Sequence, residues 1–223
     1  MDVARILYTS TVINVVGINA NGIRSKRKRL LLRKLLIEIK AGVRIITESH
    51  MRKTELRSLK IDDDYIQGQY CRDTPVGERI GGGVLILIHR GISPTKVAQL
   101  TGSEPGIEHC VVRLFLTDDP MTEMRIMGVY IRPSKTRALT RDKLRRLSEP
   151  VISKITEDAI PLLIIGDLNI TSWEQLYAEW TNEVGLHELV NPDIPAYALG
   201  SSLGKILFMP GYYIPFAFLP RPE

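Results

Sequence analysis

The sequence has few cysteines, few aromatic residues and no long hydrophobic run. Its two cysteines, Cys71 and Cys110, exclude a disulfide scaffold and a zinc site built on cysteine, and they favour a reducing intracellular compartment. The longest apolar stretches, Gly83–Ile88 and Ala159–Ile165, are far shorter than the roughly 20 residues of a membrane-spanning helix. No membrane span is therefore expected. The first residues lack the apolar core of a secretory signal, and an organelle presequence stays open.

The excess of positive over negative charge is also small. Thirty Lys and Arg residues stand against 25 Asp and Glu residues, which gives a net charge of +5. This balance permits a polyanionic partner without requiring one. With 44% hydrophobic and 25% charged residues, the composition is that of an ordinary globular protein and excludes a largely disordered chain. The length of 223 residues suits one large domain or two small ones. The order of strands and helices favours a single domain over residues 1–223.

Short β-rich runs alternate with segments of helical periodicity. Strands are predicted at Val12–Ile18, Val43–Thr47, Gly82–His89, Glu108–Leu116, Met124–Tyr130, Leu162–Ile165 and Ser202–Phe208, and helices at Lys26–Lys40, Arg141–Thr156 and Trp173–Glu183. Many of these strands are almost continuously apolar, which requires cover on both faces of a sheet. The pattern predicts an α/β fold in which two packed sheets are flanked by helices.

Polar residues follow three of the predicted strands directly. Asn19 follows the first, Glu48 the second, and Asp167 with Asn169 a later one. Strand ends can bring such side chains together at the rim of a sheet. Two carboxylates and an amide at one point suit a hard divalent cation, because Mg²⁺ prefers oxygen ligands and keeps several waters. A second carboxylate can then orient an attacking water.

Each of these residues also has a purely structural interpretation. Asn19 can cap the turn through Asn21 and Gly22, Glu48 can begin a solvated helix, and the segment of Asp167 can be an ordinary turn. Taken singly, the structural interpretation is preferred each time. The combination of all three, each behind a buried strand, favours a functional site.

Five segments, in this order along the chain, resemble the endonuclease/exonuclease/phosphatase superfamily. They are Ile-Asn19-Ala-Asn-Gly-Ile, Thr-Glu48-Ser-His, Gly81-Gly82-Gly83-Val84, Gly-Val-Tyr130-Ile-Arg-Pro and Gly166-Asp167-Leu168-Asn169. Within the superfamily, the chain looks most like the apurinic-endonuclease-like domain of non-LTR retrotransposons, which nicks target DNA to start reverse transcription. The resemblance runs from Ile13 to Phe208.

The resemblance implies a four-layer α/β/β/α sandwich of two mixed sheets, and it implies roles for single residues. Glu48 is expected to hold Mg²⁺ or Mn²⁺, with Asn19 beside it. Tyr130 is expected to contact the scissile phosphate, Asp167 to orient and deprotonate the water, and Asn169 to stabilise charge on the phosphoryl oxygens. A structural interpretation of Tyr130, as a core aromatic residue with its hydroxyl at the rim, remains beside this role.

DNA is the partner that the resemblance implies, and the nucleus would then be the compartment. Arg24, Lys26 and Arg132 are candidate contacts to the phosphate backbone. The segment from Arg24 to Lys34 can equally be a solvated helix face, because basic side chains also cover apolar neighbours.

The later family motifs are degenerate or absent. Gly204 stands where the family has aspartate, Ala196 stands where related domains usually carry threonine, and the chain contains no Asp-His dipeptide. The domain is therefore expected to lack the final Asp-His strand and to be catalytically impaired. The alternative is an inactive derivative that serves as a structural or binding subunit of a larger assembly. Its partner would be a protein, bound through the aromatic tail, whose residues are Tyr212, Tyr213, Phe216 and Phe218.

Overall fold

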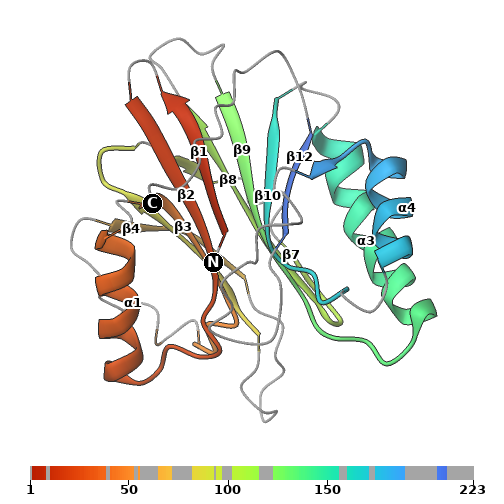
Figure 1. Ribbon diagram of the computed structural model, residues 1–223, viewed down its shortest axis with the longest axis horizontal. Helices are drawn as coiled ribbons and strands as arrows, with labels where there is room; N and C mark the ends of the chain where they lie inside the picture. The colour runs from red at the N-terminus through yellow and green to blue at the C-terminus, as the bar shows by residue number, and fades with distance from the viewer. Residues whose placement is uncertain are drawn as a thin grey trace, which may run out of the picture.

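The computed structural model of the chain describes residues 2–8, 11–38, 41–52, 55, 65–71, 82–92, 94–96, 102–115, 123–155, 160–170, 174–188 and 205–209. Within these ranges the strands form two mixed sheets, and three helices lie outside them (Figure 1). Ala196, Gly204, Trp173 and the aromatic tail lie outside the described residues.

The first sheet has five strands among the described residues, in the order β1-β2-β3-β5-β4. They are β1 (Asp2–Tyr8), β2 (Thr11–Asn19), β3 (Ala41–Thr47), β4 (Tyr65–Cys71) and β5 (Val84–His89). The pair β2 and β3 is parallel, and the other neighbours are antiparallel. The parallel pair ends both of its strands at the same edge of the sheet.

The second sheet has seven strands in the described ranges, in the order β11-β12-β10-β9-β8-β6, with β7 also paired to β8. They are β6 (Pro94–Lys96), β7 (Gly102–Glu104), β8 (Ile107–Phe115), β9 (Glu123–Ile131), β10 (Leu162–Asp167), β11 (His187–Glu188) and β12 (Lys205–Met209). Here the pair β9 and β10 is parallel. The strand predicted at Ser202–Phe208 is present as β12.

Alternation along each strand decides which side chains lie between the two sheets. Successive side chains of a strand point to opposite faces. The layer between the sheets is one buried cluster to which both sheets contribute every second residue: Val15, Val43, Ile45, Val84, Ile86, Ile88, Cys110, Val112, Leu114, Met124, Ile126, Tyr130, Leu163 and Ile165. This layer is the main hydrophobic core.

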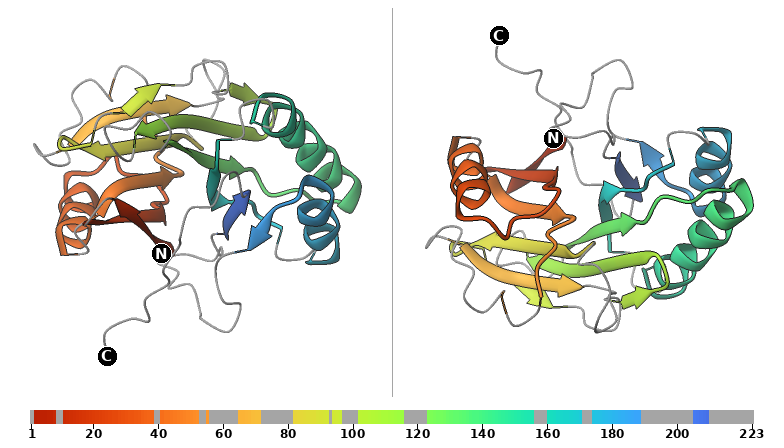
Figure 2. Two further views of the ribbon diagram at one scale, coloured as in Figure 1. Left: turned by 90° about the horizontal axis from the view of Figure 1, so that it is seen from above. Right: turned by 90° about the horizontal axis from the view of Figure 1, so that it is seen from below.

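The residues between them in sequence face the helices. Leu32 and Leu36 of α1 (Lys26–Glu38) pack with Val16, Ile46 and Leu85 on the outer face of the first sheet. The outer face of the second sheet packs in the same way against α3 (Arg137–Ile155) and α4 (Glu174–Val184), through Leu144, Leu147, Leu176, Tyr177 and Trp180. Figure 2 shows the resulting layers, with α1 on one side and α3 and α4 on the other. The predicted four-layer α/β/β/α sandwich is confirmed.

The two sheets lie close together where β9 carries Gly128. A Cβ atom at this position would lie 2.9 Å from methyl carbons of both Ile45 and Val84 in the opposite sheet. Cores do not admit such overlap without shifting their neighbours. The glycine therefore sets the spacing of the sheets in the middle of the core.

Side chains cap the starts of the two basic helices. The Ser25 hydroxyl accepts a hydrogen bond from the N–H of Lys28 at 3.2 Å, and the Thr136 hydroxyl accepts one from the N–H of Leu139 at 3.3 Å. Both are N-cap geometries. The prediction that the second of these helices begins at Arg141 was wrong, because Thr136 caps it one turn earlier.

No helix of the described residues is long and apolar enough to span a membrane.

Candidate active site

The layer between the sheets becomes polar at one end. Asn19, Thr47, Glu108, Tyr130 and Asp167 continue the inward alternation of their strands, and each lies at or next to a strand end. The register joins them in pairs, because Asn19 faces Thr47, and Tyr130 faces both Glu108 and Asp167. The fold thus collects carboxylates, an amide and a phenol at one mouth of the sandwich.

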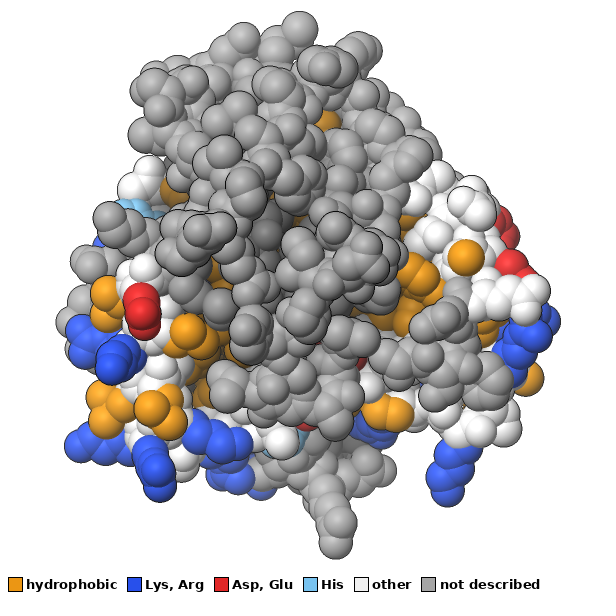
Figure 3. All heavy atoms as spheres, viewed as in Figure 1, with side chains coloured by type: hydrophobic (Ala, Val, Ile, Leu, Met, Phe, Trp, Pro, Cys, Tyr) orange, Lys and Arg blue, Asp and Glu red, His pale blue; other side chains and the backbone are white. Residues whose placement is uncertain are grey.

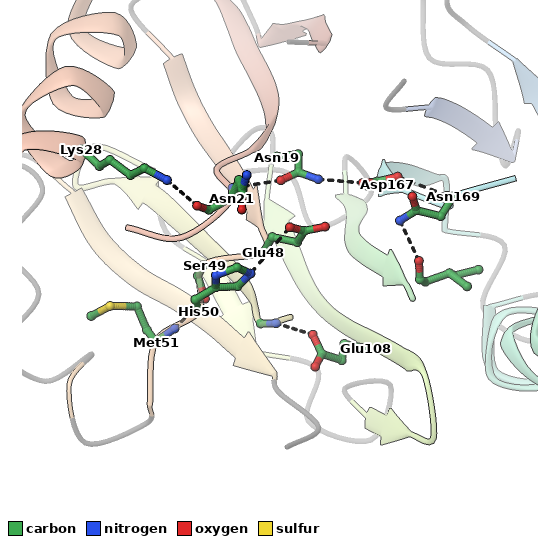
Figure 4. A network of polar contacts seen from close by, with 12 residues as sticks. Asn19, Asn21, Lys28, Glu48, Ser49, His50, Met51, Glu108, Asp167 and Asn169 are labelled. Carbon is green, nitrogen blue, oxygen red and sulfur yellow. Dashed lines mark hydrogen bonds and ion pairs between the residues drawn. The ribbon is translucent and has the colours of Figure 1, made fainter. Parts of the chain in front are cut away.

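A direct hydrogen bond joins the two sheets at this mouth. The Asn19 side-chain amide donates to Oδ2 of Asp167 at 2.7 Å, across 148 positions of sequence (Figure 4). The other end of the Asn19 amide is fixed as well, since its Oδ1 accepts from the N–H of Asn21 at 3.0 Å. Asn19 therefore holds the Asp167 carboxylate in a set orientation.

Asp167 is 1% exposed, and it also accepts a hydrogen bond from the backbone of Asn169. The N–H of Asn169 lies 3.1 Å from Oδ1 of Asp167, while the Asn169 side-chain amide donates to the carbonyl of Ile131 at 2.9 Å. Both carboxylate oxygens of Asp167 thus have hydrogen-bond donors, which fix the orientation of the group. An oriented carboxylate at this end of the sandwich is suited to accept a proton.

Tyr130 brings its hydroxyl to the same point. The side chain is almost fully buried, and the Glu48 carboxylate lies near its hydroxyl. Burial raises the pKa of Tyr130 well above its usual value, and the negative charges of Glu48, Asp167 and Glu108 raise it further. The phenol therefore stays protonated at neutral pH and can donate a hydrogen bond to an anion.

Backbone strain is concentrated around Glu48. Four non-glycine residues of the described ranges have left-handed backbone, namely Asn21, Glu48, His50 and Asn169, with φ between 42° and 53°. All four lie in the close-up of the site in Figure 4. Asparagine tolerates this region better than glutamate does, and strained residues of this kind cluster at functional sites.

Hydrogen bonds from neighbouring loops hold this strained segment. The N–H of Gly22 donates to the carbonyl of Glu48 at 2.7 Å, and the N–H of His50 donates to the carbonyl of Gly82 at 2.9 Å. The imidazole of His50 also lies 3.6 Å from the Glu48 carboxylate. The Glu48 side chain is thereby directed towards the mouth.

Glu108 is a site residue that sequence analysis missed. It is 2% exposed, and its carboxylate accepts a hydrogen bond from the N–H of Gly83. The carbonyl of Gly83 in turn accepts from the N–H of Ser49 at 3.0 Å. The available signal was alternation, because Glu108 is the one charged residue among inward-facing positions of its strand, which continue with Cys110, Val112 and Leu114.

The donors at the mouth fit a small, hard cation. The Glu48 carboxylate and the amide oxygen of Asn19 are hard oxygen donors, which Mg²⁺ prefers, and Mg²⁺ needs few protein carboxylates because it keeps several waters. In the part of the chain that is described, no three His, Cys, Asp or Glu side chains form a group that could hold a metal. Glu48 and Asn19 are the residues that would hold such a cation.

The candidate substrate contacts are exposed residues on the two sheets' flanking segments. Arg24 pairs with Glu55 at 2.6 Å, and hydrogen bonds from the Arg52 backbone and from Arg24 lower the pKa of Glu55. Lys26 is exposed at the start of α1. Arg132 is exposed one residue beyond β9, and its carbonyl accepts a hydrogen bond from Lys143 at 2.6 Å. Of the predicted residues, the structure brings together Asn19, Glu48, Tyr130, Asp167 and Asn169.

Several solved structures share this architecture. The human Nocturnin catalytic domain with bound sulfate has a TM-score of 0.62 at 13% identity, over 88% of this chain and 81% of that one. The endonuclease domain of TRAS1, a telomere-specific non-LTR retrotransposon, has a TM-score of 0.52 at 17% identity, over 88% of this chain and 84% of that one. TDP2 of D. rerio, complexed with a single-strand DNA product, has a TM-score of 0.55 at 11% identity, over 90% of this chain and 84% of that one.

These likenesses establish the fold. The chain has the endonuclease/exonuclease/phosphatase fold, which is also that of nucleases and phosphodiesterases. No protein-family model matches the sequence, and no curated protein matches it. At identities of 11–17%, the similarity is one of structure, and the activity has to be argued from the site.

Proposed function

We propose that the chain is a divalent-metal-dependent phosphodiesterase of the DNA-nicking type, with an impaired catalytic site. The observation that carries the proposal is the hydrogen-bonded set at the mouth of the sandwich. Asn19 and Asp167 are hydrogen-bonded at 2.7 Å, Asn169 donates its N–H to Asp167, and Tyr130 faces Asp167 in the strand register. Two ionisable carboxylates and a protonated phenol around one opening suit hydrolysis of a phosphodiester.

Each residue has a task that follows from its surroundings. Asp167, held by Asn19 and Asn169, accepts the proton of the attacking water. Tyr130, kept protonated by burial and by Glu48, donates a hydrogen bond to a phosphate oxygen. Glu48 and Asn19 would hold Mg²⁺ or Mn²⁺, which supplies neutralisation of the charge that develops on the phosphate. DNA is the proposed substrate, and the TRAS1 and TDP2 neighbours support this choice.

Impairment is proposed from the sequence. Gly204 replaces an aspartate of the family. Loss of one transition-state donor of this kind lowers the rate on the order of 10²- to 10³-fold. Slow nicking is therefore expected, above a background without protein.

The test is nicking of supercoiled plasmid in the presence of Mg²⁺. Asp167→Ala should abolish the slow nicking, whereas the matched control Asp142→Ala, at an exposed position of α3, should retain it. Gly204→Asp should raise the rate. Equal rates for wild type, Asp167→Ala and a no-protein control would contradict the proposal.

The alternative function is that of an inactive derivative retained as a structural or binding subunit. The replacements at Gly204 and Ala196 favour this candidate over full activity. It predicts that neither Mg²⁺ nor Gly204→Asp produces nicking. Binding of Mn²⁺, measured by its electron paramagnetic resonance signal, should then be the same for wild type and Glu48→Gln.

A further inference from the structure

The outer face of α1 exposes both apolar side chains and cations. Leu30 is 54% exposed, Leu31 60% and Ile37 50%. In the described residues the only other large hydrophobic side chain so exposed is Leu139. Figure 3 shows hydrophobic and basic side chains intermixed on the side of the molecule where Figure 1 places α1. Three such side chains on one helix leave an apolar surface in water without an evident structural reason.

The cations of this face lack acidic partners within the described part of the chain. α1 carries Lys26, Arg27, Arg33 and Lys34 on its exposed side, and none of them takes part in an ion pair or hydrogen bond there. Glu38 is the one acidic residue of the helix. The surface therefore combines uncovered hydrophobic area with uncompensated positive charge.

α3 shows that basic helices of this protein are otherwise neutralised. Arg137 and Arg141 lie 3.4 Å and 3.7 Å from Glu179 of α4. Arg145 and Arg146 likewise have Asp142 within 3.5 Å. The contrast shows that, among the described residues, the charge of α1 is not neutralised as that of α3 is.

The order of residues along α1 indicates the chemistry of that partner. Residues four apart lie next to each other on a helix, so Leu30 neighbours Lys34, Leu31 neighbours Arg27, and Ile37 neighbours Arg33. Apolar and basic side chains are thus interleaved on one face. A lipid surface suits a helix whose apolar and basic faces are separate. Inserting Leu30 and Leu31 into a bilayer would draw Lys34 and Arg27 with them.

A nucleic-acid backbone would satisfy only the basic side chains of this surface. Phosphates would pair with the cations, but they would leave the leucines and the isoleucine without apolar contact. A helix in which leucine and glutamate alternate along one face satisfies both requirements, by packing apolar side chains and pairing opposite charges along its length. α1 is about 20 Å long, so a partner helix of similar length covers it.

We propose that the outer face of α1, made of Lys26, Arg27, Leu30, Leu31, Arg33, Lys34 and Ile37, is a docking surface for an acidic amphipathic helix of a partner protein. The proposal is independent of nuclease activity, because the face lies outside the mouth that holds Glu48 and Asp167. It applies equally to a slow nuclease and to an inactive binding subunit.

The test uses a fluorescein-labelled synthetic peptide of about 20 residues with leucines at helical spacing and glutamates between them. Fluorescence anisotropy with the full chain at 150 mM salt, roughly the physiological ionic strength, should show saturable binding, and a scrambled peptide of the same composition should not bind. The variants Leu30→Ser/Ile37→Ser and Arg33→Glu/Lys34→Glu should each weaken binding about tenfold or more. The matched control Leu139→Ser, which removes an exposed leucine from α3, should leave affinity unchanged.

Charge reversal gives the decisive comparison. A second peptide, with lysine in place of glutamate, should bind Arg33→Glu/Lys34→Glu better than it binds the wild type. Duplex DNA of 20 base pairs, about two helical turns, and vesicles containing phosphatidylserine should bind with no dependence on Leu30→Ser/Ile37→Ser. The proposal is overturned if the scrambled peptide binds equally, if the leucine variant binds as well as wild type, or if vesicle binding alone requires the leucines.

Discussion

At the scale of single residues, one buried carboxylate supports the loop that carries the metal-ligand candidate. Glu108 accepts a hydrogen bond from Gly83, and the carbonyl of Gly83 accepts from Ser49, next to the strained Glu48. Glu108 therefore supports the loop of Glu48 without belonging to the predicted catalytic set. Its contribution can be separated from theirs by measuring stability.

Replacing Glu108 tests this support. Glu108→Ala leaves the buried N–H of Gly83 without an acceptor, which costs about 1–3 kcal/mol of unfolding free energy. Glu108→Gln keeps a carbonyl oxygen of similar reach and should lose less than half of that amount. Urea unfolding followed by circular dichroism measures both variants, and equal destabilisation by the two would contradict the role of the acceptor.

A second buried residue makes stability depend on pH. The His109 side chain is 4% exposed, its Nδ1 has no hydrogen-bond partner among the described residues, and burial lowers its pKa to about 4. The folded chain therefore binds the proton of His109 less readily than the unfolded chain, whose histidine titrates near 6.5. The contribution of this group to the unfolding free energy is fully present above pH 6.5 and is lost as the pH falls towards 4.

The comparison of wild type with His109→Leu isolates this effect. By pH 4 the wild type should have lost on the order of 3 kcal/mol of unfolding free energy more than the variant, as the difference in pKa requires. Near pH 7.5 the difference in unfolding free energy between the two proteins should no longer depend on pH. Parallel stability curves for the two proteins between pH 7 and pH 4 would refute the assignment.

Sequence analysis found most of the site because the relevant residues follow strong strand patterns. Asn19, Glu48 and Asp167 each come directly after an apolar run, and such runs place their ends at a common edge. Glu108 and His50 were missed for different reasons. The first stands at the start of its strand, and the second depends on loop geometry that no periodicity encodes.

At the scale of elements, β9 and β10 form the centre of the second sheet, and their parallel contact is unusually close at Gly166. Gly166 faces Val129 in the register of the two strands. A Cβ atom at this position would overlap the carbonyl oxygen of Val129, a backbone atom that cannot rotate away. The glycine of the Gly-Asp segment is therefore required by packing, whatever the chemistry of Asp167.

Gly166→Ala should accordingly destabilise the protein by about 3 kcal/mol or more, as overpacking of a rigid core does. Gly185→Ala is the matched control for the removal of a glycine, because a Cβ atom there meets nothing within 4 Å. Its positive φ of 72° should limit the loss to about 1 kcal/mol. Thermal unfolding measures both, and a smaller loss at Gly166 than at Gly185 would contradict the packing argument.

The strands that the sequence did not predict lie at the edges. β1 and β4 are the two outer strands of the first sheet, and β6 and β11 are those of the second. An edge strand is covered on fewer sides, so it tolerates polar residues and glycine, as in the sequence Tyr-Ile-Gln-Gly-Gln-Tyr-Cys of β4. Central strands such as β5 and β10 are buried along most of their length and were recognised from their apolar runs.

At the scale of the whole molecule, three hydrophobic clusters are stacked through the four layers. Leu36 of α1 belongs to the first, the layer between the sheets is the second, and Trp180 of α4 belongs to the third. Strands β2, β3 and β5 contribute alternate residues to the first two clusters, as β8, β9 and β10 do to the second and third. Loss of packing on one side should therefore be transmitted to the other.

Unfolding measured at Trp180 tests this coupling. In a Trp173→Phe background, Trp180 is the sole tryptophan, because the sequence has two. Leu36→Ala, at a fully buried position, should reduce the unfolding free energy reported by Trp180 fluorescence by about 3 kcal/mol. The same shift should appear in far-ultraviolet circular dichroism. A Trp180 transition that does not move would mean that the layers unfold separately.

The alternation that builds both the core and the mouth makes the chain sensitive to changes of length within a strand. Deleting one residue from β9 before Gly128 would exchange the faces of the residues on one side of the deletion relative to those on the other side. Either Tyr130 would turn towards α3, or Met124 and Ile126 would leave the layer between the sheets for the helix side. A one-codon deletion there would thus disrupt both the candidate site and the core packing, whereas a point substitution at Tyr130 or Asp167 can remove the site chemistry and leave the fold in place.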